Sequence, residues 1–483
     1  MNLLTKFLAS LILKILLLFF LLAPSTTEAQ RRSTSVNVSD NGKTTISIKN
    51  GFGNNFHIEY KGDITLSDDD TDVIGISRGG YMEIKKSAFG SRRRIFIESD
   101  GSGNLIKKYY VGGSQRSFDA EGRKWLSEIL LEVVRSTTLG AEKRVDRMYG
   151  KGGSYAVLKE VDKIESNHVK ARYIKLLLEK KPKSTDLISI LNAVGEIDSD
   201  HHKADILKRY SSTFLTTEKA TSAYITTTGN IDSDHHKADV LKKSIRDGNI
   251  TDTQMKALFV IAEDINSDHH KASVLLEAMR NRQLTPNNVK LLVNTSKDID
   301  SDHHKATVLR EALKTEKLSQ SAYHTLLNSV ENMSSDHHIA SIFADMAKNE
   351  LDDEALGHLL KLVEENMDSD SHRANVLKKV VYHQKLKSSS LNEFLEALTG
   401  INSDHHKAEV FKNLAKQKFT EEQLITILRA THSINSDYHK AESLLRFSSV
   451  VNESSSTVKD AYRSACMDID SDSHLGRAIK AVN

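Results

Sequence analysis

The chain has 483 residues, 39% of them hydrophobic and 27% charged, which is typical of a folded protein of two or three domains and excludes a largely disordered one. The formal net charge is only +2, and Lys and Arg are interspersed with Asp and Glu. This argues against a nucleic-acid-binding protein, because such a surface needs a one-sided basic field. Cys466 is the single cysteine, so packing without an internal disulfide must stabilise the fold.

The first 29 residues predict a signal peptide. Lys6 is followed by an apolar run from Phe7 to Leu22, and small and polar residues then lead to Ala29. We expect cleavage before Gln30, export to the periplasm or the exterior of a bacterial cell, and no stable membrane span after cleavage. The alternative is an uncleaved anchor, because the apolar run is nearly long enough to cross a bilayer. A lipoprotein is excluded, since no cysteine lies near the cleavage point.

Residues 31–117 predict a small antiparallel β domain. Asn41-Gly42 stands between the alternating segments 35–39 and 44–48, which is a strong hairpin signal. Further strands are expected at 56–60, 64–66, 73–76, 81–85, 95–98 and 105–111, which gives a sheet or sandwich of six to eight strands. The acidic stretch Asp68–Asp72 could bind calcium but lacks the glycine and glutamate of an EF-hand loop, so a solvated turn is the simpler interpretation. We expect Arg92–Arg94 in a solvated turn or at a strand edge.

Residues 118–165 change to a helical pattern. Trp125, Ile129 and Val133 recur at helical spacing, and Gly152-Gly153 interrupts the pattern further on. We expect a helical linker that caps the N-terminal end of the following array and joins it to the sheet.

From residue 166 to residue 483 one octapeptide returns about ten times. Its clearest copy is Ile197-Asp-Ser-Asp-His-His-Lys-Ala204, and its serine recurs every 33 to 35 residues. These serines are Ser166, Ser199, Ser233, Ser267, Ser301, Ser335, Ser369, Ser403, Ser436 and Ser471. A period in this range indicates an array in which each unit buries its apolar face on its neighbours.

Each unit has room for two helices of about 12 residues and two short turns. Ser199 is a good N-cap for the first helix, and Asp200 suits its positive end. The second helix is expected to begin near signals such as Thr251, Thr285-Pro286 or Thr420. The predicted fold class is therefore α+β multidomain: a small N-terminal antiparallel β domain followed by a right-handed αα-solenoid of about ten 34-residue repeats.

The repeat architecture resembles that of tetratricopeptide and HEAT repeats. The tetratricopeptide signature is absent, however, since the only tryptophan, Trp125, precedes the array. The Ser-Asp-x-His/x-Lys-Ala units also look like repeats in exported bacterial proteins, some of them attached to BlaR-like membrane zinc peptidases. Nothing in the chain matches the peptidase itself.

The repeated histidines are interpreted as structural. On a helix, His202 shares one arc with Ala204 and Ile206, whereas His201 lies on the solvent side. Adjacent histidines point about 100° apart, so one pair is poorly placed to chelate a metal ion. The alternatives are adventitious surface metal binding and a dedicated metal site. The structural repeat positions we single out are Ser199, Asp200, His202, Ala204, Ser233, Asp234, His236, Ala238, Ser267, Asp268, His270, Ala272, Ser301, Asp302, His304 and Ala306.

No catalytic, cofactor-binding or metal site is expected, because no hydrolase, zinc-protease or phosphate-loop motif is present. We predict a non-catalytic binding or scaffolding protein of the cell envelope that uses the solenoid surface for a protein or peptide partner. The alternatives are a sensor or regulatory ectodomain associated with a membrane peptidase, and an enzyme with an unrecognised site. The sequence does not indicate an oligomeric state.

Overall fold

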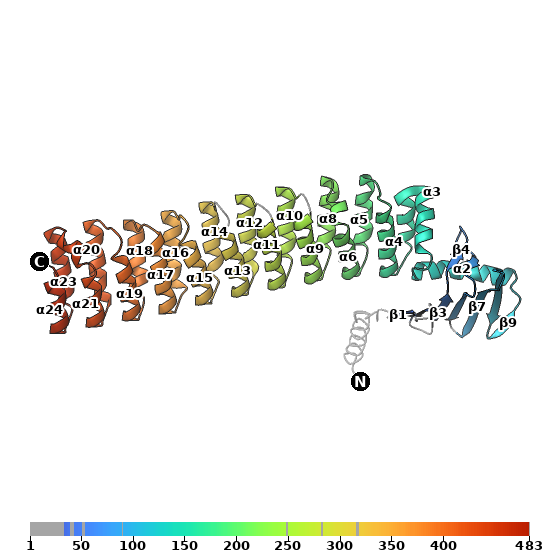
Figure 1. The fold of residues 1–483 in the computed structure, drawn as a ribbon, viewed down its shortest axis with the longest axis horizontal. Coiled ribbons are helices and arrows are strands. Elements are labelled where there is room, and N and C mark those ends of the chain that lie inside the picture. The colour runs from blue at the N-terminus through green and yellow to red at the C-terminus, as the bar shows by residue number, and fades with distance from the viewer. Residues whose placement is uncertain are drawn as a thin grey trace, which may run out of the picture. The chain divides into compact units, whose positions relative to one another are not determined.

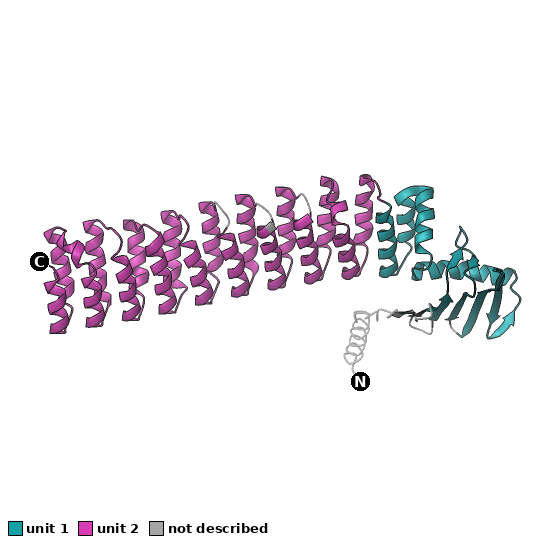
Figure 2. Ribbon diagram, viewed as in Figure 1, with its two compact units in different colours: residues 1–180 teal, residues 181–483 magenta. Residues whose placement is uncertain are grey.

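The computed structural model describes residues 33–38, 43–50, 54–88, 90–247, 250–281, 284–314 and 318–482. The predicted signal peptide and the Asn41-Gly42 turn lie outside these residues. The chain divides into two compact units, Met1–Lys180 and Lys181–Asn483 (Figure 2).

Unit 1 contains the antiparallel sheet that the alternating sequence predicts. Its strands are β1 (Ser33–Val38), β2 (Lys43–Asn50), β3 (Asn54–Lys61), β4 (Ile64–Leu66), β5 (Val73–Ile76), β6 (Tyr81–Ala88), β7 (Ser91–Ser99), β8 (Leu105–Val111) and β9 (Ser114–Arg116) (Figure 1). Seven of them form one sheet in the order β1-β2-β3-β6-β7-β8-β9, and β4 pairs with β5. The prediction of an α+β chain with an N-terminal antiparallel sheet is confirmed.

Two details of the sheet differ from the prediction. Arg92–Arg94 lie inside β7, which pairs with β6 on one side and β8 on the other, and not in a turn. A strand can accommodate three consecutive arginines because its side chains alternate: Arg92 and Arg94 share one face of the sheet, and Arg93 points to the other. The short strand β9, Ser-Gln-Arg, was not predicted, because three polar residues carry no alternation signal.

Helix α2 (Ala120–Ser136) covers one face of the sheet. Its residues Trp125, Ile129 and Val133 belong to the same buried cluster as Ile58 and Ile97 from the strands. Asp119 caps the helix by accepting a hydrogen bond from the backbone N–H of Glu121. The apolar residues that recur at helical spacing in α2 therefore complete the core of the β domain.

Helices α3 (Ala141–Val161) and α4 (Asn167–Glu179) pack against each other and complete unit 1. Helix α3 is kinked where Gly152 and Gly153 leave the helical conformation, and Gly153 has a φ of 61°, which favours glycine. Helix α4 follows the first copy of the octapeptide, and Ser166 caps it.

Unit 2 is helical throughout the part that the structure describes. Its elements are η1 (Ser184–Asp186), α5 (Leu187–Gly195), α6 (Asp200–Arg209), α7 (Ser211–Phe214), α8 (Glu218–Gly229), α9 (Asp234–Asp247), α10 (Asp252–Glu263), α11 (Asp268–Asn281), α12 (Pro286–Thr295), η2 (Ser296–Asp298), α13 (Asp302–Ala312), α14 (Gln320–Val330), α15 (Asp336–Met346), α16 (Asp353–Glu365), α17 (Asp370–His383), α18 (Ser388–Thr399), α19 (Asp404–Leu414), α20 (Glu421–Ala430), η3 (Thr431–Ser433), α21 (Asp437–Leu445), α22 (Ser448–Asn452), α23 (Ser456–Cys466) and α24 (Asp472–Lys480).

These helices form a solenoid of two layers (Figure 1). The first helix of each repeat (α6, α9, α11 and so on) packs against the first helix of the next repeat, and the second helices (α8, α10, α12 and so on) pack in the same way. Thr251, Thr285 and Thr420 cap second helices, and Pro286 stands in the first turn of α12. Among the described residues, no helix combines the length and apolar character needed to cross a membrane.

Candidate binding surface of the solenoid

The motif serine precedes the first helix of its repeat and caps it. Ser301 accepts a hydrogen bond from the backbone N–H of His304. Ser403 and Ser436 accept the equivalent bonds from the backbone N–H groups of His406 and His439. Ser233 and Ser267 accept the same bond at 3.5 Å. Ser199, Ser335, Ser369 and Ser471 stand at the N-cap positions of α6, α15, α17 and α24 without a side-chain cap hydrogen bond. The repeated serine thus occupies the start of each of these first helices, and its hydroxyl completes the cap in the others.

The motif aspartate connects one repeat to the next. The carboxylate of Asp200 accepts a hydrogen bond of 2.7 Å from the backbone N–H of Ser233, 33 residues later. The bond recurs from Ser267 to Asp234, Ser301 to Asp268, Ser335 to Asp302, Ser369 to Asp336, Ser403 to Asp370, Ser436 to Asp404 and Ser471 to Asp437, at 2.5–2.8 Å. A carboxylate acceptor makes these hydrogen bonds stronger than neutral ones. They tie the start of each first helix to the next along unit 2, beyond the dipole role that the sequence suggests for Asp200.

The motif lysine is buried, and it was not among the positions singled out from the sequence. Lys203 is 6% exposed, and its ammonium group donates to the backbone oxygen of Asn230, at the end of the second helix of the same repeat. Lys407 and Lys440 donate to the oxygens of Ser433 and Asp468 in the same way. Carbonyl groups at a helix end carry the negative pole of the helix, so a cation is favourable there. The recurrence of Lys at this position in seven of the ten octapeptide copies is the signal that could have identified this role, and Ile339, Arg373 and Leu475 stand in the other three.

The motif alanines fill the space between neighbouring first helices. Ala204, Ala238, Ala272 and Ala306 are at most 2% exposed. A larger side chain at these positions would separate the helices, because protein interiors are packed without free space.

The paired histidines form a continuous row of imidazole rings, the histidine row, over residues 201–372. The first histidine of each repeat contacts the second histidine of its own repeat and the second histidine of the next repeat. For example, the ring centre of His269 lies 5.3 Å from that of His270 and 5.5 Å from that of His304. The row comprises His202, His201, His236, His235, His270, His269, His304, His303, His338, His337 and His372 in spatial order.

The row is interrupted where the sequence replaces the first histidine. In the repeat that contains His372, the first histidine is replaced by Ser371. The row therefore ends at His372. The contacts resume from His406 through His405 to His439, where Tyr438 takes the place of the first histidine and contacts His474. An aromatic ring therefore substitutes for imidazole within the row.

This arrangement adds a contact to the sequence-based interpretation of the first histidine. His201, His235, His269, His303 and His337 are exposed, as helical geometry indicates, but they are not isolated from the stack. Stepping 100° per residue locates a side chain around its own helix and ignores the neighbouring helix, whose second histidine the exposed ring reaches. The second histidines His202, His236, His270 and His304 are half-buried.

Three rings of the histidine row favour the neutral form of imidazole. Burial, followed by the neighbouring histidines, lowers the pKa of His236, His270 and His338 below the usual value. The Nδ1 atoms of His236, His372 and His474 are buried without a hydrogen-bond partner, and each of these rings contacts the ring of a neighbouring repeat. Among the described residues there is no group of three or more His, Cys, Asp or Glu side chains that could hold a metal ion.

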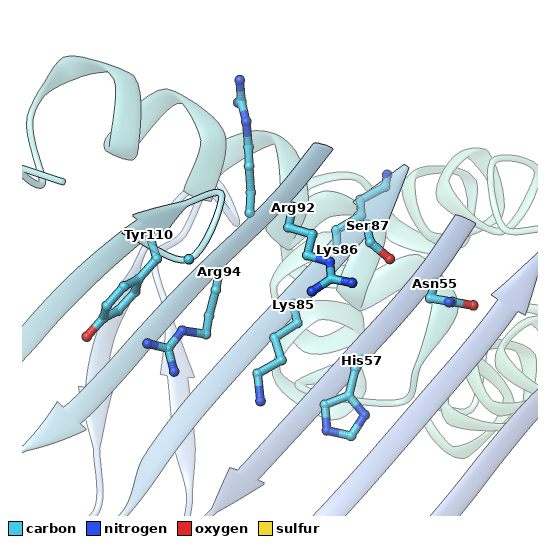
Figure 3. A pocket seen from close by; sticks show the side chains of 10 residues that line it. Asn55, His57, Lys85, Lys86, Ser87, Arg92, Arg94 and Tyr110 are labelled. Carbon is cyan, nitrogen blue, oxygen red and sulfur yellow. The ribbon is translucent and has the colours of Figure 1, made fainter. Parts of the chain in front are cut away.

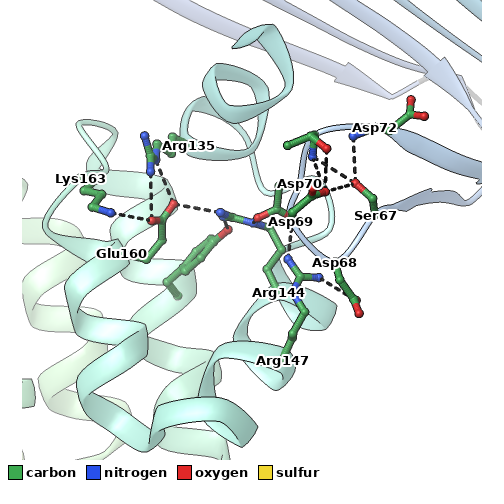
Figure 4. A network of polar contacts seen from close by, with 12 residues as sticks. Ser67, Asp68, Asp69, Asp70, Asp72, Arg135, Arg144, Arg147, Glu160 and Lys163 are labelled. Carbon is green, nitrogen blue, oxygen red and sulfur yellow. Dashed lines mark hydrogen bonds and ion pairs between the residues drawn. The ribbon is translucent and has the colours of Figure 1, made fainter. Parts of the chain in front are cut away.

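The acidic stretch of unit 1 is engaged by arginines (Figure 4). Asp70, 5% exposed, accepts hydrogen bonds from Arg144 at 2.8 Å and Arg147 at 2.6 Å. Arg144 is 1% exposed and also donates to Glu160 at 2.9 Å. Asp69 folds back on its own turn, where its carboxylate accepts hydrogen bonds from the Ser67 and Thr71 hydroxyls. Asp68 and Asp69 are exposed, as expected for a solvated turn, but Asp70 departs from that interpretation because it connects the β4–β5 turn to helix α3.

Comparison with known proteins adds little to this description. No protein-family model matches the sequence. None of the curated proteins matches it either. Among solved structures, the crystal structure of the Chs5-Bch1 exomer cargo adaptor complex matches with 12% sequence identity over 83% of this chain and 84% of that chain, at a TM-score of 0.18. A similarity of this size carries no argument, so a relation to tetratricopeptide, HEAT or peptidase-linked repeats stays a prediction.

Proposed function

We propose that the chain is a non-catalytic binding or scaffolding protein of the bacterial cell envelope. Residues 1–29 direct its export, and the solenoid surface binds a protein or peptide partner. The observation that carries the proposal is the exposed first histidine of five successive repeats, His201, His235, His269, His303 and His337.

Three other side chains of the motif have roles within the stack. The serine stands at a helix N-cap, the aspartate binds the next repeat, and Lys203 and its equivalents are buried. The exposed motif side chains are the first histidine and the second residue of the octapeptide, such as His201 and Asp198, and the histidine is the one that five successive repeats keep unchanged. A repeat array offers the same chemistry at every step, which suits an extended ligand.

The spacing of the first helices is compatible with an extended peptide. Packed helices lie about 8–10 Å apart, and every third residue of an extended strand advances about 10 Å. One ligand residue in three could thus meet successive first histidines. Imidazole can donate or accept a hydrogen bond, so backbone groups or carboxylates of the ligand are suitable partners.

The test is chemical crosslinking and capture from a bacterial envelope fraction with the purified chain. A variant with His201, His235, His269, His303 and His337 all replaced by Ala should lose the captured partner while keeping its helical circular dichroism. A matched variant with Lys219, Lys256 and Lys290 replaced by Ala, which removes exposed side chains of second helices, should retain it. Equal loss in both variants, or no specific partner at all, would contradict binding at the histidine surface.

A further inference from the structure

The sheet of unit 1 carries a row of polar side chains on the face opposite α2. The strand register places His57 of β3 beside Lys85 of β6, Lys85 beside Arg94 of β7, and Arg94 beside Tyr110 of β8. Figure 3 shows these four side chains side by side across four strands, lining a hollow. Successive side chains of a strand point to opposite faces of the sheet. This polar row therefore lies on one face, and the apolar core lies on the other.

Positive charge accumulates in this hollow. Lys85 and Arg94 are directly opposite each other, and like charges in this position destabilise a sheet unless something offsets them. Glu83 offsets both, because its carboxylate lies 2.5 Å from the Lys85 ammonium group and 3.1 Å from the Arg94 guanidinium. Arg92 is exposed on the same face and adds a third cation to the single carboxylate.

The rest of the lining consists mainly of hydrogen-bond donors. Asn55 and Ser87 face each other across β3 and β6 beside Arg92, and both line the hollow. The guanidinium of Arg94 lies 3.7 Å from the ring centre of Tyr110, which fixes its plane and leaves the N–H groups that do not contact Glu83 for a ligand. Guanidinium, ammonium, amide and hydroxyl donors converging on one hollow fit an oxyanion.

The acidic residues elsewhere on this face are paired away from the hollow. Glu59 accepts a hydrogen bond from the Tyr81 hydroxyl at 2.5 Å, and Glu98 lies 2.8 Å from the Lys108 ammonium group. The face as a whole is therefore mixed in charge, which disfavours flat contact with an anionic membrane. The end with Lys85, Arg92 and Arg94 has a local excess of cations over the single carboxylate of Glu83, which favours a small ligand.

We propose that this hollow binds a small soluble oxyanion of high charge, of the pyrophosphate type. Arg92 and Arg94 bind its terminal oxygens, Lys85 supplies a point charge, and Asn55 and Ser87 donate neutral hydrogen bonds. This site is independent of the solenoid surface and of the function proposed for it.

Inorganic pyrophosphate is the probe, and isothermal titration calorimetry with the whole purified chain is the measurement. Arg92→Gln should weaken pyrophosphate binding about tenfold, since a charge-assisted hydrogen bond is lost. Arg94→Lys should also weaken it, because Lys keeps the charge but loses the planar pair of donors. Affinity should fall as salt is raised, since the ligand is held by charge.

Arg78→Gln is the matched control, because it removes the same charge from an exposed turn of the same unit. It should leave pyrophosphate binding unchanged. Absence of pyrophosphate binding at low salt, or an equal effect of Arg78→Gln and Arg92→Gln, would overturn the proposal. So would Arg92-dependent binding to vesicles of anionic lipid without binding of pyrophosphate, since the ligand would then be a membrane surface.

Discussion

At the scale of single residues, His269 and His270 are adjacent in the chain and differ in burial. His270→Ala should lower the free energy of unfolding by about 1–2 kcal/mol, because a half-buried ring that contacts His235 and His269 leaves a gap. His269→Ala should cost about 0.5 kcal/mol, because exposed side chains contribute less. Urea unfolding followed by helical circular dichroism compares the two variants. A larger effect of His269→Ala would mean that the exposed rings carry the packing.

The histidine row also predicts a loss of stability in acid. Burial first, then His269 and His235, lower the pKa of His270 in the folded protein, while nearby Lys242 lowers it and Asp234 raises it to a smaller extent. The unfolded chain, with a histidine pKa of about 6.5, then binds more protons than the folded chain. Stability should be fully present above that pH and decline as the pH falls below it.

Melting temperatures measured between pH 7.5 and pH 5 test the acid prediction. A chelator at pH 7.5 should leave the melting temperature unchanged if ring contacts alone hold the row. A melting temperature that is constant across this range, or one that falls with chelator, would show that protonation of neutral rings is not the controlling step.

At the scale of elements, Asp268 tests the connection between consecutive first helices. Asp268→Ala removes the acceptor for the backbone N–H groups of Ser301 and Asp300, which lie 2.7 and 3.3 Å from its carboxylate. We expect a loss of about 1–3 kcal/mol, because a part-buried N–H is left without its partner. The control is Asp264→Ala, an exposed position three residues before Ser267. It should lower the free energy of unfolding, measured by urea unfolding, by less than about 0.5 kcal/mol. Equal costs would refute a specific link between repeats.

In unit 1, a substitution of Asp70 tests whether its buried ion pair with Arg144 stabilises the fold. Asp70→Asn should destabilise the unit by about 3–5 kcal/mol, because it leaves the buried guanidinium of Arg144 with less compensating charge. Asn tolerates the φ of 60° at this position, so backbone strain does not confuse the result. Asp68→Asn is the control, since that carboxylate is 90% exposed and 3.9 Å from Arg147.

Fluorescence of Trp125, the only tryptophan, reports unit 1 separately because its side chain lies in the core between α2 and the sheet. The urea midpoint from this signal should move with Asp70→Asn and stay in place with Asp68→Asn. A shift of equal size in both variants would show that total charge, and not the buried ion pair, stabilises the unit.

Element positions were predictable wherever a local signal exists. Thr251 and Thr285 marked helix starts correctly, because capping depends on neighbouring residues. The bond from Asp200 to Ser233 spans 33 residues and the contact from His201 to His236 spans 35, so no local pattern indicates them. The arginines of β7 were misplaced for a similar reason: strand pairing on both sides sets the backbone of this segment, while the side chains of Arg92, Arg93 and Arg94 stay at least partly exposed.

At the scale of the whole molecule, the contacts of unit 2 are periodic. Each repeat binds its neighbour through the same Asp–Ser hydrogen bond, and from His201 to His372 also through the same histidine contact and, at Ala204, Ala238, Ala272 and Ala306, the same buried alanine. The stability of such an array is close to a sum over repeats and their interfaces. One repeat is therefore interchangeable with the next, provided that a whole period is added or removed.

Deletion of the repeat from Ser267 to Asp300 tests this periodicity. The deletion joins Asn266 to Ser301 and restores an intact octapeptide, so Asp234 can accept the N–H of Ser301 in place of Ser267. Ile265, fully buried, then stands where Ile299 was, also fully buried. We expect a shorter protein that keeps cooperative unfolding and loses helical signal in proportion to its length.

Deletion of Ser267 to Asn281 alone is the matched control. It removes one first helix, so the second helix α12 would follow the second helix α10 directly and the two layers would lose their alternation. We expect this variant to aggregate or to lose cooperative unfolding, measured by circular dichroism during urea titration. If the whole-repeat deletion unfolds as poorly as the single-helix deletion, neighbouring repeats are not equivalent and the solenoid is stabilised by contacts specific to each position.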